Sequence, residues 1–206
     1  MIKTNLNYRL FFLFKFLLLF VFCFKLFADD VKKYEEMVVI GSNAAPIKIK
    51  IFSSFTCPHC ADFHTKIIPK IKEKYVNTNQ VQIIHVDFPL DQAAFNASKL
   101  LHCIEQKNQI SFLDKIYEDQ DKWASGSNIK QINENLKKIV LNFGINEIKF
   151  NKCLNNEKIS DRILNSRIDA HKRYSINSTP TIVINEKKLE GSVNFKNISI
   201  KIEKLI

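Results

Sequence analysis

Alternation of apolar and polar positions is clearest in three short parts of the chain. Lys48–Phe52 alternates polar and apolar side chains, which is typical of a β-strand with one buried face. Val81–Phe88 is apolar and β-branched enough to be the next strand. Thr181–Ile184 and Lys187–Glu190 flank a short polar turn, so they predict a hairpin near the end of the chain.

Between the first two strands the apolar spacing becomes helical. Pro58 suits the first turn of a helix, because the N–H that it lacks would have no partner there. Pro69 lies inside the same run and predicts a kink. The apolar positions at helical spacing are Phe63, Ile67, Ile68, Ile71 and Tyr75.

Helical spacing also dominates the middle of the chain, with breaks expected at Gly126 and Gly144. The pattern therefore predicts β-α-β, then a block of helices, then β-β-α, with no internal repeat. The helices expected in and after the block are Asp91–Gln106, Ile110–Lys122, Ile129–Phe143, Glu147–Leu154, Asp161–Tyr174 and, last, Phe195–Leu205.

The first 28 residues have the layout of a secretory signal. A basic start without acids is followed by an apolar stretch, Leu10–Phe27, and then by the small residue Ala28. This order predicts cleavage after Ala28. An uncleaved membrane anchor is the alternative, because the 18 apolar-rich residues of Leu10–Phe27 are near the lower limit for spanning a bilayer.

The charge of the chain points to no nucleic-acid partner. The full sequence of 206 residues carries a net charge of +10. Removing the four bases of the first 28 residues from the 31 in the chain leaves 27 against 21 acids, a net charge of +6. The remaining bases are scattered, and they form no basic stripe with interleaved aromatic residues.

Four cysteines follow the predicted signal: Cys57, Cys60, Cys103 and Cys153. An even number of cysteines in an exported chain indicates disulfides, because that compartment is oxidising. Three pairings are possible. Cys57 with Cys60 is the natural local pair, and it would leave Cys103 for Cys153.

The sequence Cys57-Pro58-His59-Cys60 lies between a predicted strand and a predicted helix. A helix N-terminus carries a partial positive charge that stabilises a thiolate. We therefore expect Cys57 to be the exposed nucleophile and Cys60, one turn further, to be the more buried thiol that closes the disulfide. His59 and Pro58 would tune the pair, and stabilising its reduced form makes the disulfide a stronger oxidant.

Two other interpretations of this motif are weaker. A purely structural disulfide across two residues would close almost no loop and would gain little entropy. A metal site could use Cys57, His59, Cys60 and His64, but such sites usually have a second distant ligand pair. Cys103 and Cys153, 50 residues apart, do not form one, so we expect no metal.

These motifs together resemble the DsbA family of thiol–disulfide oxidoreductases over about residues 38–206. Besides CPHC at 57–60, the resemblance rests on DFPLD at 87–91, QDKWA at 120–124 and NSTPTIVIN at 177–185. It implies the α/β class: a thioredoxin-like fold formed by residues 29–90 and 168–206, with an all-helical insertion at 91–167.

The resemblance also implies the roles of several residues. Cys57 is the attacking cysteine and Cys60 the resolving one. Pro180 is a cis-proline beside the active disulfide, and the backbone of Thr179 pairs with the substrate. Without the resemblance, a proline before an apolar strand would mark only a turn. Cys103 and Cys153 resemble an extra pair found in the helical domain of some relatives, which favours a structural bridge over two free thiols or a redox role.

The implied function is a periplasmic oxidase that introduces disulfides into reduced substrate proteins. It would act as a monomer, would need no bound cofactor, and would be reoxidised by a membrane quinone-linked, DsbB-like partner. Thr179 before the proline is shared with some isomerases and reductases, so those activities remain alternatives. A metal-binding module with a thioredoxin fold is the alternative from another class.

Several other residues are expected to have structural roles. His64 is expected at the surface or on the helix flank, where it could still tune the site. His85 is expected to be structural, and His102, His171 and Trp123 are expected to pack inside the fold.

Overall fold

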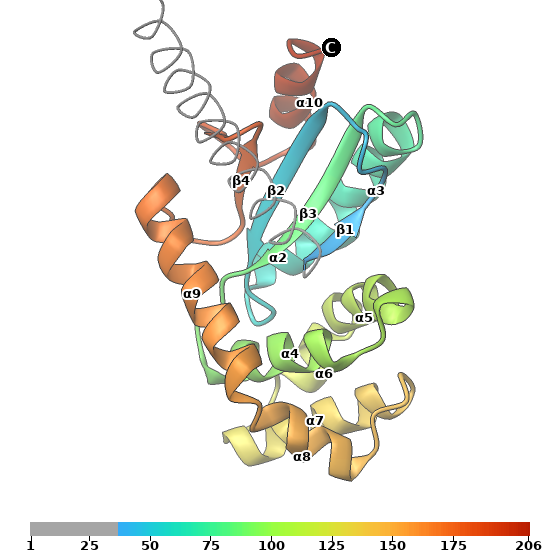
Figure 1. Ribbon diagram of the computed structural model, residues 1–206, viewed down its shortest axis with the longest axis vertical. Coiled ribbons are helices and arrows are strands. Elements are labelled where there is room, and N and C mark those ends of the chain that lie inside the picture. The colour runs from blue at the N-terminus through green and yellow to red at the C-terminus, as the bar shows by residue number, and fades with distance from the viewer. Residues whose placement is uncertain (1–36) are drawn as a thin grey trace, which may run out of the picture. The chain divides into compact units, whose positions relative to one another are not determined.

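The computed structural model describes residues 37–206 (Figure 1). In this part of the chain the strands form a five-stranded sheet in the order β1-β3-β2-β4-β5. β2 runs parallel to β3, and the other neighbours are antiparallel. The strands are β1 Val38–Ile40, β2 Ile47–Ser53, β3 Val81–Asp87, β4 Thr181–Ile184 and β5 Lys187–Lys188.

The predicted strands are all present, although one is shorter than predicted. The structure also contains one strand that was not predicted. The last strand ends at Lys188 and does not reach Glu190. β1 was not predicted, because three residues are too few to show a period. It pairs with β3 at the edge of the sheet.

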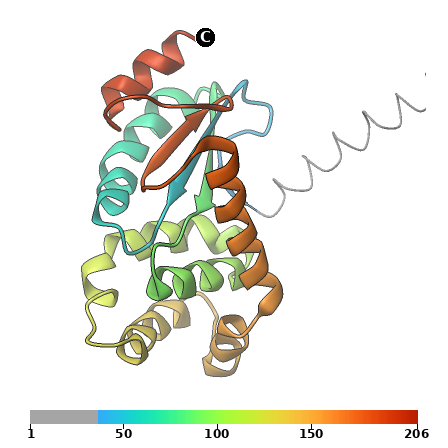
Figure 2. The ribbon, with the colours of Figure 1, turned by 90° about the vertical axis from the view of Figure 1, so that its left-hand side faces the viewer.

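Both faces of the sheet are covered, which the alternation in β2 did not indicate. Lys50 points away from the isoleucine face, yet it is only 8% exposed. Its ammonium donates to Tyr174 Oη at 3.0 Å and to Glu186 Oε1 at 2.5 Å. Figure 2 shows α9 on this side of the sheet, with the helices after β2 and α10 on the other. A central strand covered on both faces needs a polar partner for each polar side chain.

The helical segment after β2 is confirmed, but its turns are irregular. It comprises α2 Pro58–Asp62, the π-helical η1 Phe63–Ile67, α3 Ile68–Ile71 and the π-helical η2 Lys72–Val76. Pro69 has no N–H for the carbonyl four residues earlier. The wider turn of η1 lies directly before it and replaces the simple kink that the sequence predicted.

Six helices, α4 to α9, separate the two halves of the sheet, and α10 closes the chain. Side-chain oxygens at the N-caps fix where five of these seven helices begin: Asp91, Asn128, Asn146, Asn156 and Asn194 each accept a backbone N–H three residues later. The helices are α4 Gln92–Cys103, α5 Gln106–Glu118, α6 Gln120–Trp123, α7 Ile129–Leu141, α8 Glu147–Leu154, α9 Glu157–Tyr174 and α10 Phe195–Glu203.

The helical block differs from its prediction in three respects. The expected helix Ile110–Lys122 is divided into α5 and α6 at Asp119. The expected start of α9 at Asp161 was too late, because the helix begins four residues earlier at Glu157, after the N-cap Asn156. The expected boundary after residue 167 falls inside the continuous helix α9.

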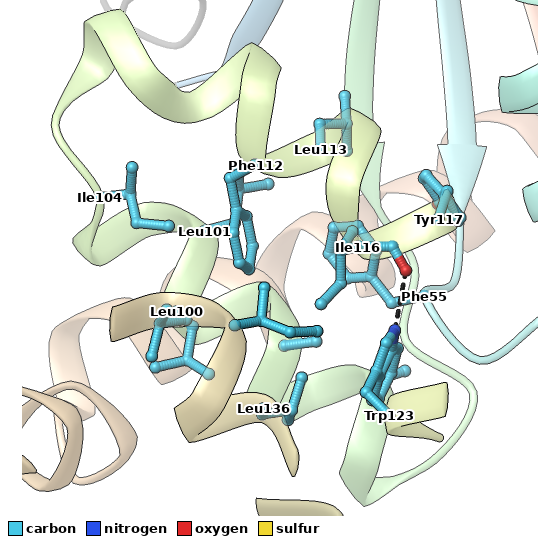
Figure 3. Close-up of a cluster of buried hydrophobic side chains, with 14 of the residues drawn as sticks. Phe55, Leu100, Leu101, Ile104, Phe112, Leu113, Ile116, Tyr117, Trp123 and Leu136 are labelled. Carbon is cyan, nitrogen blue, oxygen red and sulfur yellow. Dashed lines mark hydrogen bonds between the residues drawn. The ribbon is translucent and has the colours of Figure 1, made fainter. Parts of the chain in front are cut away.

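Buried apolar side chains form two separate clusters, one packed against the sheet and one inside the helical block. One lies between the sheet and the helices η1, α3, η2 and α10, around Ile49, Ile71 and Ile198. The other fills the helical block (Figure 3), where Trp123 Nε1 donates to Ile116 O at 2.8 Å. Cys57 and Cys60 belong to this second cluster. The helical block therefore forms one wall of the site described below.

No helix within residues 37–206 is long and apolar enough to cross a membrane. The predicted signal at residues 1–28 lies outside the described part of the chain.

Candidate functional site

Cys57 stands at the N-cap of α2, directly after the loop that leaves β2. Its backbone is extended, with φ −81° and ψ 117°, and Pro58 occupies the first helical turn. Its carbonyl accepts the N–H groups of Cys60 at 3.0 Å and Ala61 at 3.2 Å. The predicted position between a strand and a helix N-terminus is confirmed. Both active-site cysteines are free thiols in this structure.

The two thiols differ in their surroundings. Cys57 is 8% exposed and Cys60 is 1% exposed. The expectation that Cys57 is openly exposed was therefore wrong, because Phe55 and the helical block pack around the pair. Burial raises the pKa of Cys60 to about 12, against the opposing effects of hydrogen bonds from the Thr179 side chain and the Ser54 backbone. Cys60 is thus a protonated thiol at neutral pH.

The loop before β4 completes the site from the other end of the chain. The Thr179–Pro180 peptide bond is cis. The Cys57 thiol donates to the Thr179 carbonyl at 3.4 Å. Thr179 and Pro180 therefore lie beside Cys57, as the resemblance implied. Pro58 and His59 are exposed on the outer side of the CPHC turn.

The helical block holds the active-site loop in place through a residue that the sequence did not single out. Gln120 of α6 is 5% exposed, and its amide donates to Phe55 O at 2.7 Å and to Cys57 O at 3.0 Å. Thr56 donates to Asp91 Oδ2 at 2.6 Å, which ties the same loop to the N-cap of α4. Gln120 lies in the QDKWA stretch that carried part of the resemblance, but no pattern in the chain assigned it a partner.

His64 lies inside the protein and not at the surface, so this expectation was wrong. It is 6% exposed, its Nε2 lies 2.6 Å from Asp114 Oδ1, and its ring stacks on Tyr117 at 4.8 Å. The hydrogen bond from His64 lowers the pKa of Asp114. Asp114 and Tyr117 are both on α5, a helix whose approach to α2 no local pattern predicts.

A second buried ionic cluster lies at the end of β3. His102 Nε2 is 2.6 Å from Asp87 Oδ2, and His85 Nε2 is 3.6 Å from Asp87 Oδ1. Burial would raise the pKa of Asp87, but the charges and hydrogen bonds of His102 and His85 outweigh it, so the pKa lies well below its usual range. His85 and His102 are thus structural, as expected, but they act as partners of a buried carboxylate.

This cluster predicts a specific response to acid. A carboxyl whose pKa is lower in the folded state stabilises the fold above its unfolded pKa of about 4, and this contribution is lost as the pH falls through the folded value. We expect Asp87→Asn to lower the free energy of unfolding at pH 7 and to weaken its dependence on pH below about 4. Urea unfolding between pH 7 and pH 2 measures both effects. The exposed Asp161→Asn is the matched control, and a curve for Asp87→Asn parallel to that of the wild type would contradict the prediction.

Cys103 and Cys153 form a disulfide between the last turn of α4 and α8. It encloses α5, α6 and α7 in a loop of 50 residues. Lys149 and Lys152 flank it at the surface, in a depression of about 500 Å³. Within residues 37–206, no group of three or more His, Cys, Asp or Glu side chains is arranged to hold a metal ion.

Comparison with known proteins places this geometry in a family. The thioredoxin family profile matches residues 33–204. The crystal structure of α-DsbA1 from Wolbachia pipientis is similar with a TM-score of 0.74 at 31% identity, over 82% of this chain and 90% of that one. This chain belongs to the DsbA-like thioredoxin family. Its fold is therefore thioredoxin-like with a helical insertion, and it is a protein-disulfide oxidoreductase.

Curated relatives carry names of the same kind. A Rickettsia bellii protein named as a protein-disulfide oxidoreductase is 29% identical over 88% of this chain and 69% of its own length. Disulfide bond formation protein D of Bacillus subtilis is 24% identical over 81% of this chain and 75% of its own length. Four further Rickettsia relatives are longer, and this chain spans 60–62% of them. A DsbA-like protein acts on substrate proteins by thiol–disulfide exchange.

Proposed function

We propose that this DsbA-like protein is an oxidase that introduces disulfides into reduced substrate proteins through Cys57 and Cys60. The asymmetry of the pair carries the proposal. Cys57 lies at a helix N-terminus beside the Thr179 carbonyl, whereas Cys60 is buried in the protein interior and its thiol has a pKa of about 12. One thiol of such a pair forms the mixed disulfide with the substrate, and the other is the buried resolving thiol.

The reaction proceeds by two exchanges. A substrate thiolate attacks Cys57 Sγ of the oxidised enzyme, the Cys57–Cys60 bond breaks, and Cys60 leaves and takes up a proton. A second substrate thiolate then attacks the substrate sulfur of the mixed disulfide, and Cys57 leaves as a thiolate. The substrate loses two electrons and the enzyme gains them. Thr179 and Pro180 present the backbone edge that aligns the substrate beside Cys57, and Pro58 and His59 tune the couple.

Reoxidation requires an acceptor for these two electrons. We assign this role to a membrane quinone-linked, DsbB-like partner and place the protein in the periplasm as a monomer. The signal-like start of the sequence supports the location, and the fact that one chain supplies Cys57, Cys60 and Pro180 supports the monomer. The N-terminal sequence of the protein purified from its own cells should begin at Asp29. An intact N-terminus would favour the membrane anchor.

The redox potential of the Cys57–Cys60 couple tests the direction of the reaction. Residues 29–206 are equilibrated with glutathione buffers, and the fraction of reduced protein is measured by thiol alkylation and mass. An oxidase should have a potential above about −180 mV, whereas a value near about −270 mV would mark a reductant and overturn the proposal. Refolding of scrambled ribonuclease as fast as that of reduced ribonuclease would indicate an isomerase instead.

A further inference from the structure

The side-chain amide of Gln120 lies against two main-chain carbonyls of the active-site loop. Its Nε2 donates to Phe55 O at 2.7 Å and to Cys57 O at 3.0 Å. Gln120 is 5% exposed and Phe55 is 1% exposed. Both hydrogen bonds are therefore out of reach of bulk water, which could not replace the amide if it were removed. Through this amide, the helical insertion holds the backbone on both sides of Thr56.

The two carbonyls belong to peptide groups that set the direction of the Cys57 side chain. The Phe55 carbonyl is in the peptide group before Thr56, and the Cys57 carbonyl is in the group that follows Cys57 itself. Peptide groups are planar, so fixing these two leaves little freedom for the backbone dihedrals between them. The Cys57 thiol lies 3.4 Å from the Thr179 carbonyl, and its place there depends on those dihedrals.

The short helix that carries Gln120 is firmly attached to the helical block. Trp123 of the same helix is 1% exposed, and its Nε1 donates to Ile116 O at 2.8 Å (Figure 3). Asp119, directly before α6, pairs with two lysine ammonium groups at 2.8 Å each. A side chain on an element held in this way keeps its geometry better than one on a loop. The amide of Gln120 thus fixes the active-site loop relative to the helical block.

We propose that Gln120 is a positioning residue for thiol–disulfide exchange at Cys57. The inference rests on the proposed role of Cys57 as the attacking thiol. In the exchange, the Cys57 thiolate attacks a disulfide, a new S–S bond forms, and the far sulfur of the broken bond leaves as a thiolate. Gln120 gives and takes no proton or electron. Its amide keeps Cys57 Sγ aligned with the attacked bond, and a misplacement of about 1 Å can slow a reaction by about a hundredfold.

A second hydrogen bond also holds the active-site loop and defines the alternative. Thr56 Oγ1 donates to Asp91 Oδ2 at 2.6 Å. This bond is at the surface, because Asp91 is exposed, so water can replace it when it is lost. We therefore expect the buried amide, and not the Thr56 hydroxyl, to control the position of Cys57.

Stopped-flow reaction of the full-length protein with dithiobis(nitrobenzoate) measures the attack by Cys57 directly. In a Cys60→Ala background with the Cys103–Cys153 disulfide intact, each protein releases one coloured thiolate as Cys57 attacks the reagent. Gln120→Met replaces the amide by an apolar side chain of similar length. It should slow this release by about tenfold to a hundredfold at pH 7, because Cys57 is no longer held in line.

Asn96→Leu is the matched control, because it also removes a buried amide from the helical block. The Asn96 side chain donates to Asn133 Oδ1 at 2.9 Å and accepts from Gln92 at 2.8 Å, and the residue is 5% exposed. Neither partner belongs to the active-site loop. Asn96→Leu should lower the free energy of unfolding in urea, as Gln120→Met does, but should leave the rate of Cys57 unchanged.

A carboxyl at position 120 gives a pH-dependent readout that a merely structural role would not produce. In Gln120→Glu, the protonated carboxyl can donate one hydrogen bond to a loop carbonyl, whereas the ionised form repels both carbonyl oxygens. Burial keeps the new carboxyl neutral above the usual pKa of a glutamate. The ratio of the Gln120→Glu rate to the Gln120→Met rate should therefore exceed one at pH 6 and fall below one by pH 9.

Other titratable groups lie on the elements around Gln120, and both variants contain them. Their titration therefore cancels in this ratio of rates. They are Cys57 on α2, His85 and Asp87 on β3, Asp91 before α4, Tyr117 on α5 and Asp119 before α6.

The outcomes separate this inference from the proposed function. A Gln120→Met rate within about twofold of the Asn96→Leu rate, or a ratio that does not change with pH, would overturn the inference. Slowing by Thr56→Val alone would also overturn it and would assign the positioning to the Thr56 hydroxyl. A background protein in which Cys57 releases no coloured thiolate would instead overturn the proposed role of Cys57.

Gln120→Asn keeps the test decisive if Gln120→Met does not fold. Its amide is one methylene too short to reach both carbonyls, so it should slow the release to an intermediate extent. A rate for Gln120→Asn equal to that of the Cys60→Ala background would overturn the inference.

Discussion

Replacement of Cys57 by alanine should reduce disulfide exchange to the rate without enzyme, whereas replacement of Cys60 should trap an intermediate. Cys57 is the more accessible thiol and lies beside the Thr179 carbonyl, so it forms the bond to the substrate. Without Cys60, the mixed disulfide at Cys57 cannot be resolved from within the enzyme. Oxidation of reduced ribonuclease measures the first effect. The second is measured on non-reducing gels after mixing each variant with disulfide-bonded substrate proteins, where the Cys57 thiolate attacks a substrate disulfide and one substrate sulfur leaves as a thiolate.

The two variants serve as each other's control, because each removes one buried sulfur from the same turn. Covalent adducts should form with Cys60→Ala and be absent with Cys57→Ala, and both variants should remain folded. Adducts that form only with Cys57→Ala would reverse the assigned roles. Activity in both variants would show that the CPHC turn does not carry the reaction at all.

Removing the Cys103–Cys153 disulfide should cost about 4 kcal/mol of folding free energy, because the crosslink restricts a loop of 50 residues in the unfolded chain. For a chain of this size the midpoint of thermal unfolding should fall by about 8–16 °C. The loop contains α5 and α6, which supply Asp114, Tyr117 and Gln120 to the site. The loss therefore also loosens the helical wall behind the active-site loop.

The comparison is made with Cys57 and Cys60 both replaced by serine, so that only one disulfide is present. Urea unfolding of this protein, with and without Cys103→Ala and Cys153→Ala, gives the difference directly. A loss below about 1 kcal/mol would mean that the unfolded chain is already restricted without the crosslink.

Local patterns in the sequence were sufficient for most of the fold. The strands at Ile47–Ser53 and Val81–Asp87 and the helix Glu147–Leu154 follow from period and end signals that neighbouring residues carry. The boundaries that failed have local causes too. The three residues of β1 are too short for a period, and the break at Asp119 is a single backbone turn inside an otherwise helical pattern.

The residues of the candidate site also divide into those that local sequence patterns placed and those that they did not. The spacing of Cys57 and Cys60 is visible along the chain, because strand, turn and helix meet within a few residues. The place of Pro180 beside them was implied only by the family resemblance. Gln120, Asp114 and Tyr117 were not assigned to the site. They reach it only because the helical insertion folds back on α2, and nothing near them in the sequence reports that contact.

The sequence by itself determined the chemistry of this protein: a dithiol at a helix N-terminus and the order of strands and helices around it. The proline loop opposite the dithiol was implied by the family resemblance. The tertiary structure decided the environment of that chemistry. It buried Cys60 and raised its pKa, enclosed His64 against Asp114, and paired Asp87 with His102. Burial and charge pairing depend on residues that are distant along the chain, and hydrophobic period alone carries no information about which of them meet.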